Sequence, residues 1–225
     1  MALDFRLFGY ATPDNSRITR ICLAAAFAYV GIEHHDVDAL RADEPDLFRL
    51  NCHPLRGAGG PVLETEAGCL FESNAIVRYI ARLGVAAGIY GSGDFEASQI
   101  DGWLDYVLSE LDPHAFAVLK MVNGYCAKDE AAVRRHHDDF MSGLQGLEVR
   151  LEGLTFLVGE RTTVADLAVF ATVDMYLRFC GALAADVYAK CPHVVRHFMT
   201  VLHLPKVQAV LASVAGHGGQ VPAKP

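Results

Sequence analysis

The chain has 225 residues, of which 52% are hydrophobic and 20% are charged, so it is long enough for one large or two small domains and too apolar for a disordered chain. Nineteen Lys and Arg residues against 27 Asp and Glu residues give a formal net charge of −8. Because nucleic acid and anionic membranes would repel this charge, we expect neither as a partner.

The start of the chain and its cysteines bear on location and redox state. No apolar run approaches the roughly 20 residues of a membrane span, and the first residues lack the features of a signal peptide, so we expect a cytoplasmic protein. The six cysteines form no C-x-x-C pair, and we predict reduced thiols without a disulfide.

Neighbouring side chains such as those of His136 and His137 point about 100° apart on a helix. They cannot easily share one ion, so no metal site is predicted.

The first third of the chain alternates short strand-like runs with helical ones. The strands are expected at Phe5–Tyr10, Ile32–Asp38, Pro61–Thr65 and Gly68–Phe71, and the helices at Ser16–Val30 and Ser73–Leu83. Both helices place apolar residues at helical spacing, so each presents one face to a sheet. The order of these elements predicts a mixed four-stranded sheet with helices packed against it.

A glycine-rich stretch separates this part from a purely helical one. It divides the chain into a domain at 1–84, a linker at 85–93 and an all-helical domain at 94–225 with a mobile tail from about 216. Helices are expected near Phe95–Val122, Asp129–Leu154, Thr163–Leu177, Cys191–Leu202 and Pro205–Val214.

One motif suits a ligand with an amino-acid head group. The run Phe71-Glu-Ser-Asn-Ala-Ile-Val-Arg-Tyr-Ile-Ala81 lies where a strand meets a helix. A helix start offers free N–H groups and a partial positive charge, so Ser73 and the amides after it can hold a carboxylate. Glu72 can hold an ammonium group beside it. An ordinary helix cap is the alternative interpretation.

This motif, with Gly60-Pro61-Val62-Leu63 upstream, resembles the glutathione-binding half of a glutathione transferase. The resemblance implies an α/β thioredoxin-like N-terminal domain, an all-α C-terminal domain, and glutathione as co-substrate without a metal. It also implies a cis proline at Pro61, with the backbone of Gly60 pairing with the cysteine of the ligand.

The helical part supports the same resemblance. In Phe156–Leu167, Thr163 and Asp166 have the spacing of a capping box, and we expect a structural role for Asp166. The closest subfamily is the transferase-like N-terminal domain of elongation factor 1B gamma, which is similar at Thr12–Arg17, at Phe71–Ile76, at Trp103 and at Phe156–Arg161. That factor continues into a further domain, so we expect either a stand-alone enzyme or an isolated first domain.

Catalysis in this family requires a donor that stabilises the glutathione thiolate, because a thiol with a pKa near 8.5 is only about 3% ionised at pH 7. Serine-type classes carry their hydroxyl four residues before the arginine that matches Arg17, where this chain has Pro13. Tyr10 lies near the tyrosine-type position, but the pattern around it differs. The remaining donors are Thr12, Asn15, Ser16 and Arg17. We favour Asn15 and Ser16 at the helix start, with plain helix capping as the alternative.

The resemblance implies further contacts. His53 or Arg56 could meet the glycyl carboxylate of glutathione, although His53 could equally be a plain loop residue. A homodimer is expected, in which Asp101 could reach the ammonium of the ligand across a two-fold interface. Tyr106, Glu110 and His114 are expected to line the pocket for the electrophile, although a solvated helix edge would show the same spacing.

The favoured function is conjugation of the glutathione thiolate to hydrophobic electrophiles, or attack of the same thiolate on a peroxide. The rival function is a non-catalytic module, like the elongation factor 1B gamma domain, that docks a translation-factor partner. Pro13 in the serine position supports the rival. A cysteine-type thiol reductase is a third interpretation, but its cysteine is missing from the loop before the first helix.

Overall fold

A four-stranded mixed sheet forms one end of the molecule. The computed structural model describes residues 4–9, 14–36 and 60–215. The strands are β1 (Asp4–Gly9), β2 (Gly31–Asp36), β3 (Val62–Thr65) and β4 (Gly68–Phe71), in the order β2-β1-β3-β4. β1 and β2 run parallel, and the other neighbours run antiparallel. The predicted mixed sheet is therefore confirmed.

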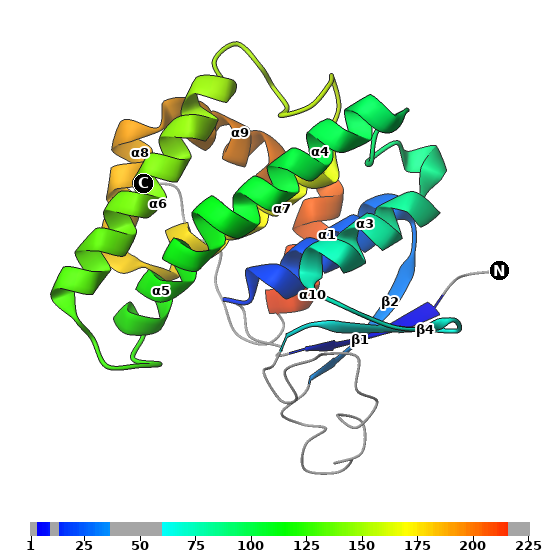
Figure 1. The fold of residues 1–225 in the computed structure, drawn as a ribbon, viewed down its shortest axis with the longest axis horizontal. Coiled ribbons are helices and arrows are strands. Elements are labelled where there is room, and N and C mark those ends of the chain that lie inside the picture. The colour runs from blue at the N-terminus through cyan, green and yellow to red at the C-terminus, as the bar shows by residue number, and fades with distance from the viewer. Residues whose placement is uncertain (1–3, 10–13, 37–59, 216–225) are drawn as a thin grey trace.

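Helices α1 (Ser16–Ala28) and α3 (Ser73–Leu83) pack side by side against this sheet (Figure 1). Leu7 and Leu63 of the sheet and the apolar faces of both helices belong to one buried core. Gly9 ends β1, and a Cβ there would collide with the side chain of Ile18. This close approach brings the end of β1 directly against the start of α1.

Helices alone make up the rest of the described chain. They are α4 (Asp94–Tyr106), α5 (Asp112–Val122), α6 (Glu130–Arg150), α7 (Val164–Phe179), α8 (Ala184–Lys190), α9 (Pro192–Leu202) and α10 (Pro205–Ala215), with short 3-10 turns at Val85–Ala87 and Gly181–Leu183. The sequence did not predict α8, because a seven-residue helix is too short to show a periodic pattern. No helix in the described ranges is long and apolar enough to cross a membrane.

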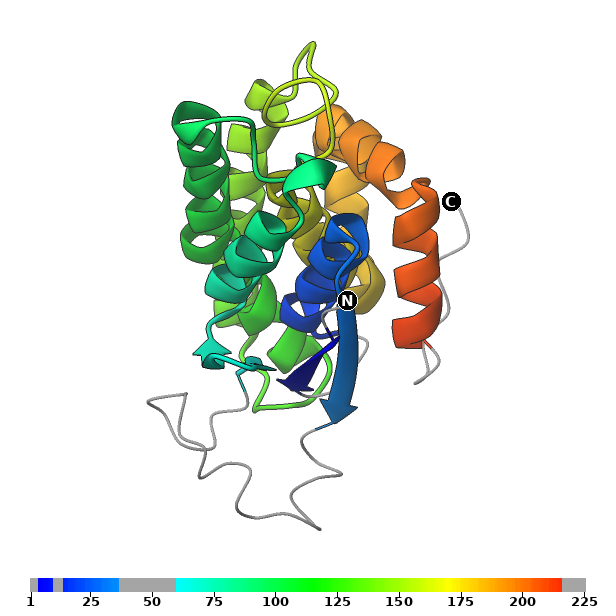
Figure 2. The ribbon, with the colours of Figure 1, turned by 90° about the vertical axis from the view of Figure 1, so that its right-hand side faces the viewer.

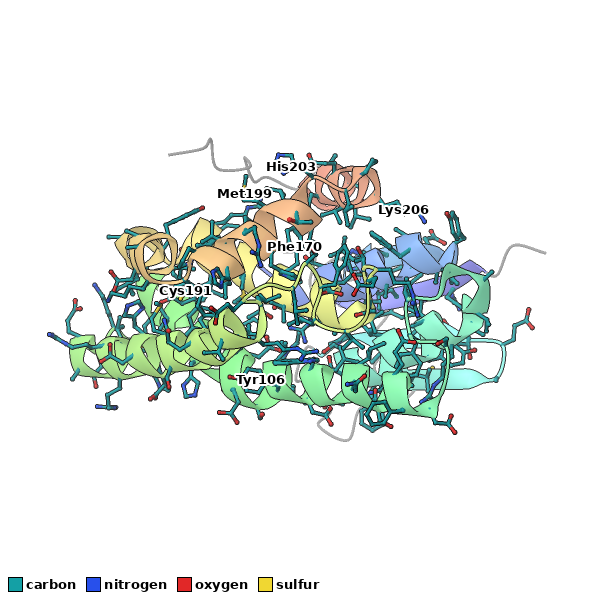
Figure 3. The ribbon with its side chains drawn as sticks, turned by 90° about the horizontal axis from the view of Figure 1, so that it is seen from above. Tyr106, Phe170, Cys191, Met199, His203 and Lys206 are labelled. Atoms are coloured by element: carbon teal, nitrogen blue, oxygen red, sulfur yellow. The ribbon has the colours of Figure 1, made fainter. Side chains whose placement is uncertain are left out.

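Helix α7 joins the two parts of the molecule. Every residue from Val164 to Leu177 is buried, and α1 packs against this helix. Phe170 stacks on Phe198 of α9 with ring centroids 5.2 Å apart, near the middle of the molecule (Figure 3). On its other side α1 contacts α10 (Figure 2). The first helix is therefore enclosed by both the sheet and the helical part.

The single long helix expected at Phe95–Val122 is wrong in one detail. A π-helical turn at Val107–Leu111 separates α4 from α5, and the N–H of Asp112 donates to the carbonyl of Val107. Pro113 has no N–H, and in a regular helix its ring would press on the carbonyl one turn earlier. A wider turn before the proline relieves that conflict.

The resemblance implied a cis peptide bond at Pro61, and this expectation is wrong. No cis bond occurs among the described residues, and Gly60 and Pro61 are both described. The trans form is the lower-energy form of an X–Pro bond unless the surrounding turn requires the other.

Candidate functional site

The start of α3 has an unusual backbone. Glu72 has φ 68° and ψ 123°, a region that side-chain-bearing residues rarely adopt, and its side chain is exposed. Such a conformation costs about 1–3 kcal/mol and persists where the surrounding structure enforces it, often at ligand sites. Ser73, the first residue of the helix, is only 2% exposed. Glu72 is therefore the exposed member of the predicted receptor, and Ser73 is enclosed.

The sheet brings this receptor next to Gly60 and Pro61. Val62 pairs with Phe71 across β3 and β4, so the residues before Val62 lie beside those after Phe71. The end of β1 meets the same point, because a Cβ on Gly9 would lie 3.9 Å from the Cα of Pro61. The predicted glutathione-binding residues Gly60, Pro61, Glu72 and Ser73 are thus brought together at one end of the sheet.

The structure describes three of the predicted thiolate donors at the start of α1: Asn15 and Arg17 contact other groups of the protein, and Ser16 is buried. The side chain of Asn15 accepts a hydrogen bond of 3.4 Å from the N–H of Ile18 and caps the helix. Ser16 is 1% exposed, and its hydroxyl has no hydrogen-bond partner among the described residues. The guanidinium of Arg17 lies 4.9 Å from the ring centroid of Phe116 on α5. The capping role of Asn15 is confirmed, and a role in holding a thiolate stays a prediction.

Several predicted residues cannot be placed. Thr12 and Tyr10 of the catalytic loop, and His53 and Arg56 for the glycyl carboxylate, lie outside the described residues. So does the expected mobile tail from residue 216.

Asp101 is bound within its own chain. One carboxylate oxygen accepts a 2.5 Å hydrogen bond from Nε of Arg78 on α3, and the hydroxyl of Tyr90 donates to both oxygens at 2.7 and 2.8 Å. Burial, followed by the Asp101 carboxylate, raises the pKa of Tyr90. These contacts join α3 to α4. The predicted reach of Asp101 toward a partner subunit's ligand stays a prediction.

Two of the three residues predicted for the electrophile pocket face α6. The hydroxyl of Tyr106 donates to the carbonyl of Gly143 at 2.9 Å (Figure 3), and Nδ1 of His114 lies 3.1 Å from Nδ1 of His136. Glu110 is exposed. Phe116 is the α5 residue that contacts the start of α1. The sequence analysis did not single out Phe116, because its contact with Arg17 joins positions 99 residues apart.

A buried polar cluster centred on Arg20 joins the sheet-bearing part to the helices. Nη2 of Arg20 donates to both carboxylate oxygens of Asp112 at 2.8 and 2.9 Å and to the hydroxyl of Thr172 at 2.9 Å. Nη1 donates to Asn74 at 3.2 Å, and Asn74 in turn donates to the carbonyl of Leu104 at 2.7 Å. Arg20 and Asp112 are each 1% exposed. The sequence gives little sign of this cluster, because its members lie far apart along the chain.

The expected structural role of Asp166 is confirmed. Its carboxylate accepts hydrogen bonds from the N–H and hydroxyl of Thr163 at 2.8 and 2.9 Å, which completes the capping box of α7. The other oxygen accepts from the N–H of Leu157 at 2.9 Å and lies 2.9 Å from Nε2 of His197. This fully enclosed carboxylate fixes a loop and two helices.

The cysteines of the described ranges form no disulfide, and three of them are unreactive because of their environment. Burial raises the pKa of Cys22 to about 11, of Cys180 to about 12 and of Cys191 to about 11. Since the thiolate is the nucleophile, these three thiols are poorly reactive at neutral pH.

Two family models match the chain: the glutathione S-transferase N-terminal domain at residues 3–82 and the C-terminal domain at residues 101–205. Among curated proteins, elongation factor 1-gamma of Trypanosoma cruzi is 37% identical over 212 residues, covering 94% of this chain and 50% of the relative. Probable elongation factor 1-gamma 2 of Arabidopsis thaliana is 30% identical over 199 residues, covering 88% of this chain and 47% of the relative. The chain thus spans about half the length of these relatives.

Solved structures agree on the fold. Glutathione transferase F2 of Populus trichocarpa superposes with a TM-score of 0.81 at 19% identity, covering 94% of this chain and 99% of that one. A Phanerochaete chrysosporium glutathione transferase crystallised with oxidized glutathione gives a TM-score of 0.81 at 19% identity, covering 96% and 97%. The two models match the sheet-bearing part and the helical part in turn, and the chain therefore belongs to the glutathione S-transferase family.

Proposed function

We propose that the chain is a non-catalytic interaction module of the elongation factor 1-gamma type, which docks a protein partner of the translation machinery. The observation that carries this proposal is the similarity to elongation factor 1-gamma, which extends over 94% of the chain at 37% identity. The similarity therefore includes both the sheet and the helical part. The similarity therefore favours the interaction module over the glutathione transferase.

The residues at the start of α1 have structural contacts that are compatible with a non-catalytic module. A thiolate needs a hydrogen-bond donor within about 3 Å of the sulfur. Asn15 uses its side-chain oxygen as a helix cap, the Ser16 hydroxyl is buried, and the Arg17 guanidinium stacks on Phe116. Capping, burial and stacking are structural roles that require no thiolate, in line with the helix-capping interpretation of the sequence.

A second candidate function, glutathione conjugation, is favoured by the start of α3. The backbone of Glu72 is held at φ 68° beside a helix start, opposite Gly60 and Pro61. An exposed carboxylate next to free N–H groups is complementary to the ammonium and carboxylate of a γ-glutamyl group. A module that binds glutathione without turning it over would account for both observations.

Turnover is the decisive test between these functions. The chain is assayed with glutathione and a chlorodinitrobenzene-type electrophile, beside the heat-denatured chain and a catalytic transferase of the same fold. The proposal predicts a rate no higher than that of the denatured chain. A rate well above it, saturating in both substrates, would establish the transferase instead.

Docking is tested separately. The tagged chain is passed through an extract, and bound proteins are identified by mass spectrometry, with the same catalytic transferase as control. We expect translation elongation components to be enriched on the chain and not on the control. Equal recovery on both would contradict the docking proposal.

We also propose a homodimer about a two-fold axis, as the sequence resemblance implied. Its test is sedimentation at micromolar concentration, where a species near the 24.4 kDa of one chain would contradict it.

A further inference from the structure

Two imidazoles and one carboxylate converge between α5 and α6. Nδ1 of His114 lies 3.1 Å from Nδ1 of His136 and 3.6 Å from a carboxylate oxygen of Asp139. One ligand atom from each of the three residues lies within 4.8 Å of the others. Both histidines are half-buried and Asp139 is exposed, so the cluster is reachable from solvent.

The two helices supply this cluster in a fixed arrangement. His136 and Asp139 are three residues apart on α6 and share one face, and His114 comes from the helix packed against it. The neighbouring His137 points away: its Nδ1 lies 2.7 Å from the hydroxyl of Tyr176 and its Nε2 lies 3.1 Å from Asp186. The sequence predicts no metal site because neighbouring histidines diverge, but the fold pairs His136 with a histidine from another helix.

We propose that His114, His136 and Asp139 bind a divalent transition-metal ion of the zinc class. Two ring nitrogens in contact can share either one proton or one metal ion. Zinc lies about 2.0–2.1 Å from each nitrogen ligand, which in a tetrahedral site separates two nitrogens by roughly 3.3 Å. The observed 3.1 Å needs only a small adjustment. Magnesium and calcium prefer all-oxygen sites, so this mixed donor set disfavours them.

The bound ion would connect α5 to α6. His114 and His136 are 22 residues apart, on either side of the turn that links the two helices. With three protein ligands, one coordination position is left for water. Because the ion would bind the folded chain and not the unfolded one, it would stabilise the pair of helices.

The test uses Co²⁺ as a spectroscopic probe and Zn²⁺ as a competitor on the purified, metal-free chain. We expect visible d–d absorption that saturates near one Co²⁺ per chain and disappears when Zn²⁺ is added. His114→Gln and His136→Gln should each weaken Co²⁺ binding by more than about tenfold, since each removes one of three ligands. Zn²⁺ at roughly a hundredfold excess over its Kd should raise Tm by about 5–10 °C in the unaltered chain and by much less in these variants.

The matched control is His203→Gln. His203 is exposed at the end of α9, at the edge of the molecule (Figure 3), and should leave both readouts unchanged. Asp139→Asn alters only an exposed side chain and is expected to fold. It should also weaken Co²⁺ binding, so it tests the site even if a histidine variant does not fold. The proposal is overturned if Co²⁺ gives no saturable absorption. It is also overturned if the cluster variants bind the ion as tightly as the His203 control does.

Discussion

Two arginines one turn apart on α1 have opposite environments. Arg20 is 1% exposed and holds the Asp112 carboxylate with two hydrogen bonds, while Asn74 and Thr172 complete its surroundings. Arg17 is half-buried, and its guanidinium lies over the ring of Phe116. Two arginines within one turn of α1 therefore have different roles: Arg20 pairs with a buried carboxylate, and Arg17 packs on an aromatic ring.

The contrast indicates that different parts of α1 contribute to stability and to ligand binding. The inner face of α1 is committed to holding the sheet and the helices together, because a buried charge must be paired and hydrogen-bonded. The first turn of α1 lies against the end of β1, close to the predicted γ-glutamyl receptor at Pro61 and Glu72. Substitutions at the Arg20 cluster should therefore change stability, and substitutions at the α3 start should change binding.

The largest effect is expected from Asp112→Ala. Removing the carboxylate leaves the Arg20 charge buried and unpaired, which should lower the free energy of unfolding by about 3–5 kcal/mol. Urea unfolding followed by far-UV circular dichroism measures this change. The control is Glu64→Gln on the sheet surface, which breaks the 2.6 Å pair with the half-exposed Arg6 and should cost less than about 1 kcal/mol. If both variants lose the same free energy of unfolding, the buried Arg20–Asp112 pair stabilises the protein no more than the surface Arg6–Glu64 pair does.

The next effect concerns glutathione binding at the start of α3. Glu72→Gln and Ser73→Ala should each weaken binding by about 1.5–3 kcal/mol, or roughly 10- to 150-fold, by removing a charge-assisted contact while the fold stays intact. Calorimetry measures the affinity. Glu66→Gln, in the exposed turn between β3 and β4, is the control and should bind as the unaltered chain does. Unchanged affinity in both test variants would refute the γ-glutamyl receptor.

Asn15→Ala separates a structural role from a catalytic one. Losing the cap on α1 should cost about 0.5–2 kcal/mol in unfolding free energy and leave glutathione affinity unchanged. If turnover exists and falls about 30- to 150-fold in Asn15→Ala or Ser16→Ala, these residues hold the thiolate. If Thr12→Ala or Tyr10→Phe abolishes turnover instead, the hydroxyl at the end of the first strand carries that role.

The smallest effect is expected from Tyr106→Phe. It removes the 2.9 Å hydrogen bond to the Gly143 carbonyl, which should cost about 0.5–1.5 kcal/mol in stability. Thermal unfolding and the affinity for the electrophile, by calorimetry, are measured together, and only the first should change. Tyr29→Phe, at an exposed ring that retains its contact with Lys206, is the control. A loss of electrophile affinity in Tyr106→Phe would instead place this residue in the pocket.

The sequence determined the elements and their class. Short strand-like runs and helical patterns located all four described strands and most helices, and Thr163 with Asp166 predicted a capping box that the structure contains. These features depend on residues close together in the chain, so spacing alone is informative. The glutathione-site motif at Glu72 and Ser73 is local for the same reason.

Only the tertiary structure decided which distant side chains meet. Arg20 reaches Asp112 across 92 positions, and His114 faces His136 where the sequence offered only the diverging pair His136-His137. The pattern of one helix does not state which face of another it will contact. That choice depends on how whole faces pack, which is why the buried ion pair and the histidine cluster could not be predicted and the capping box could.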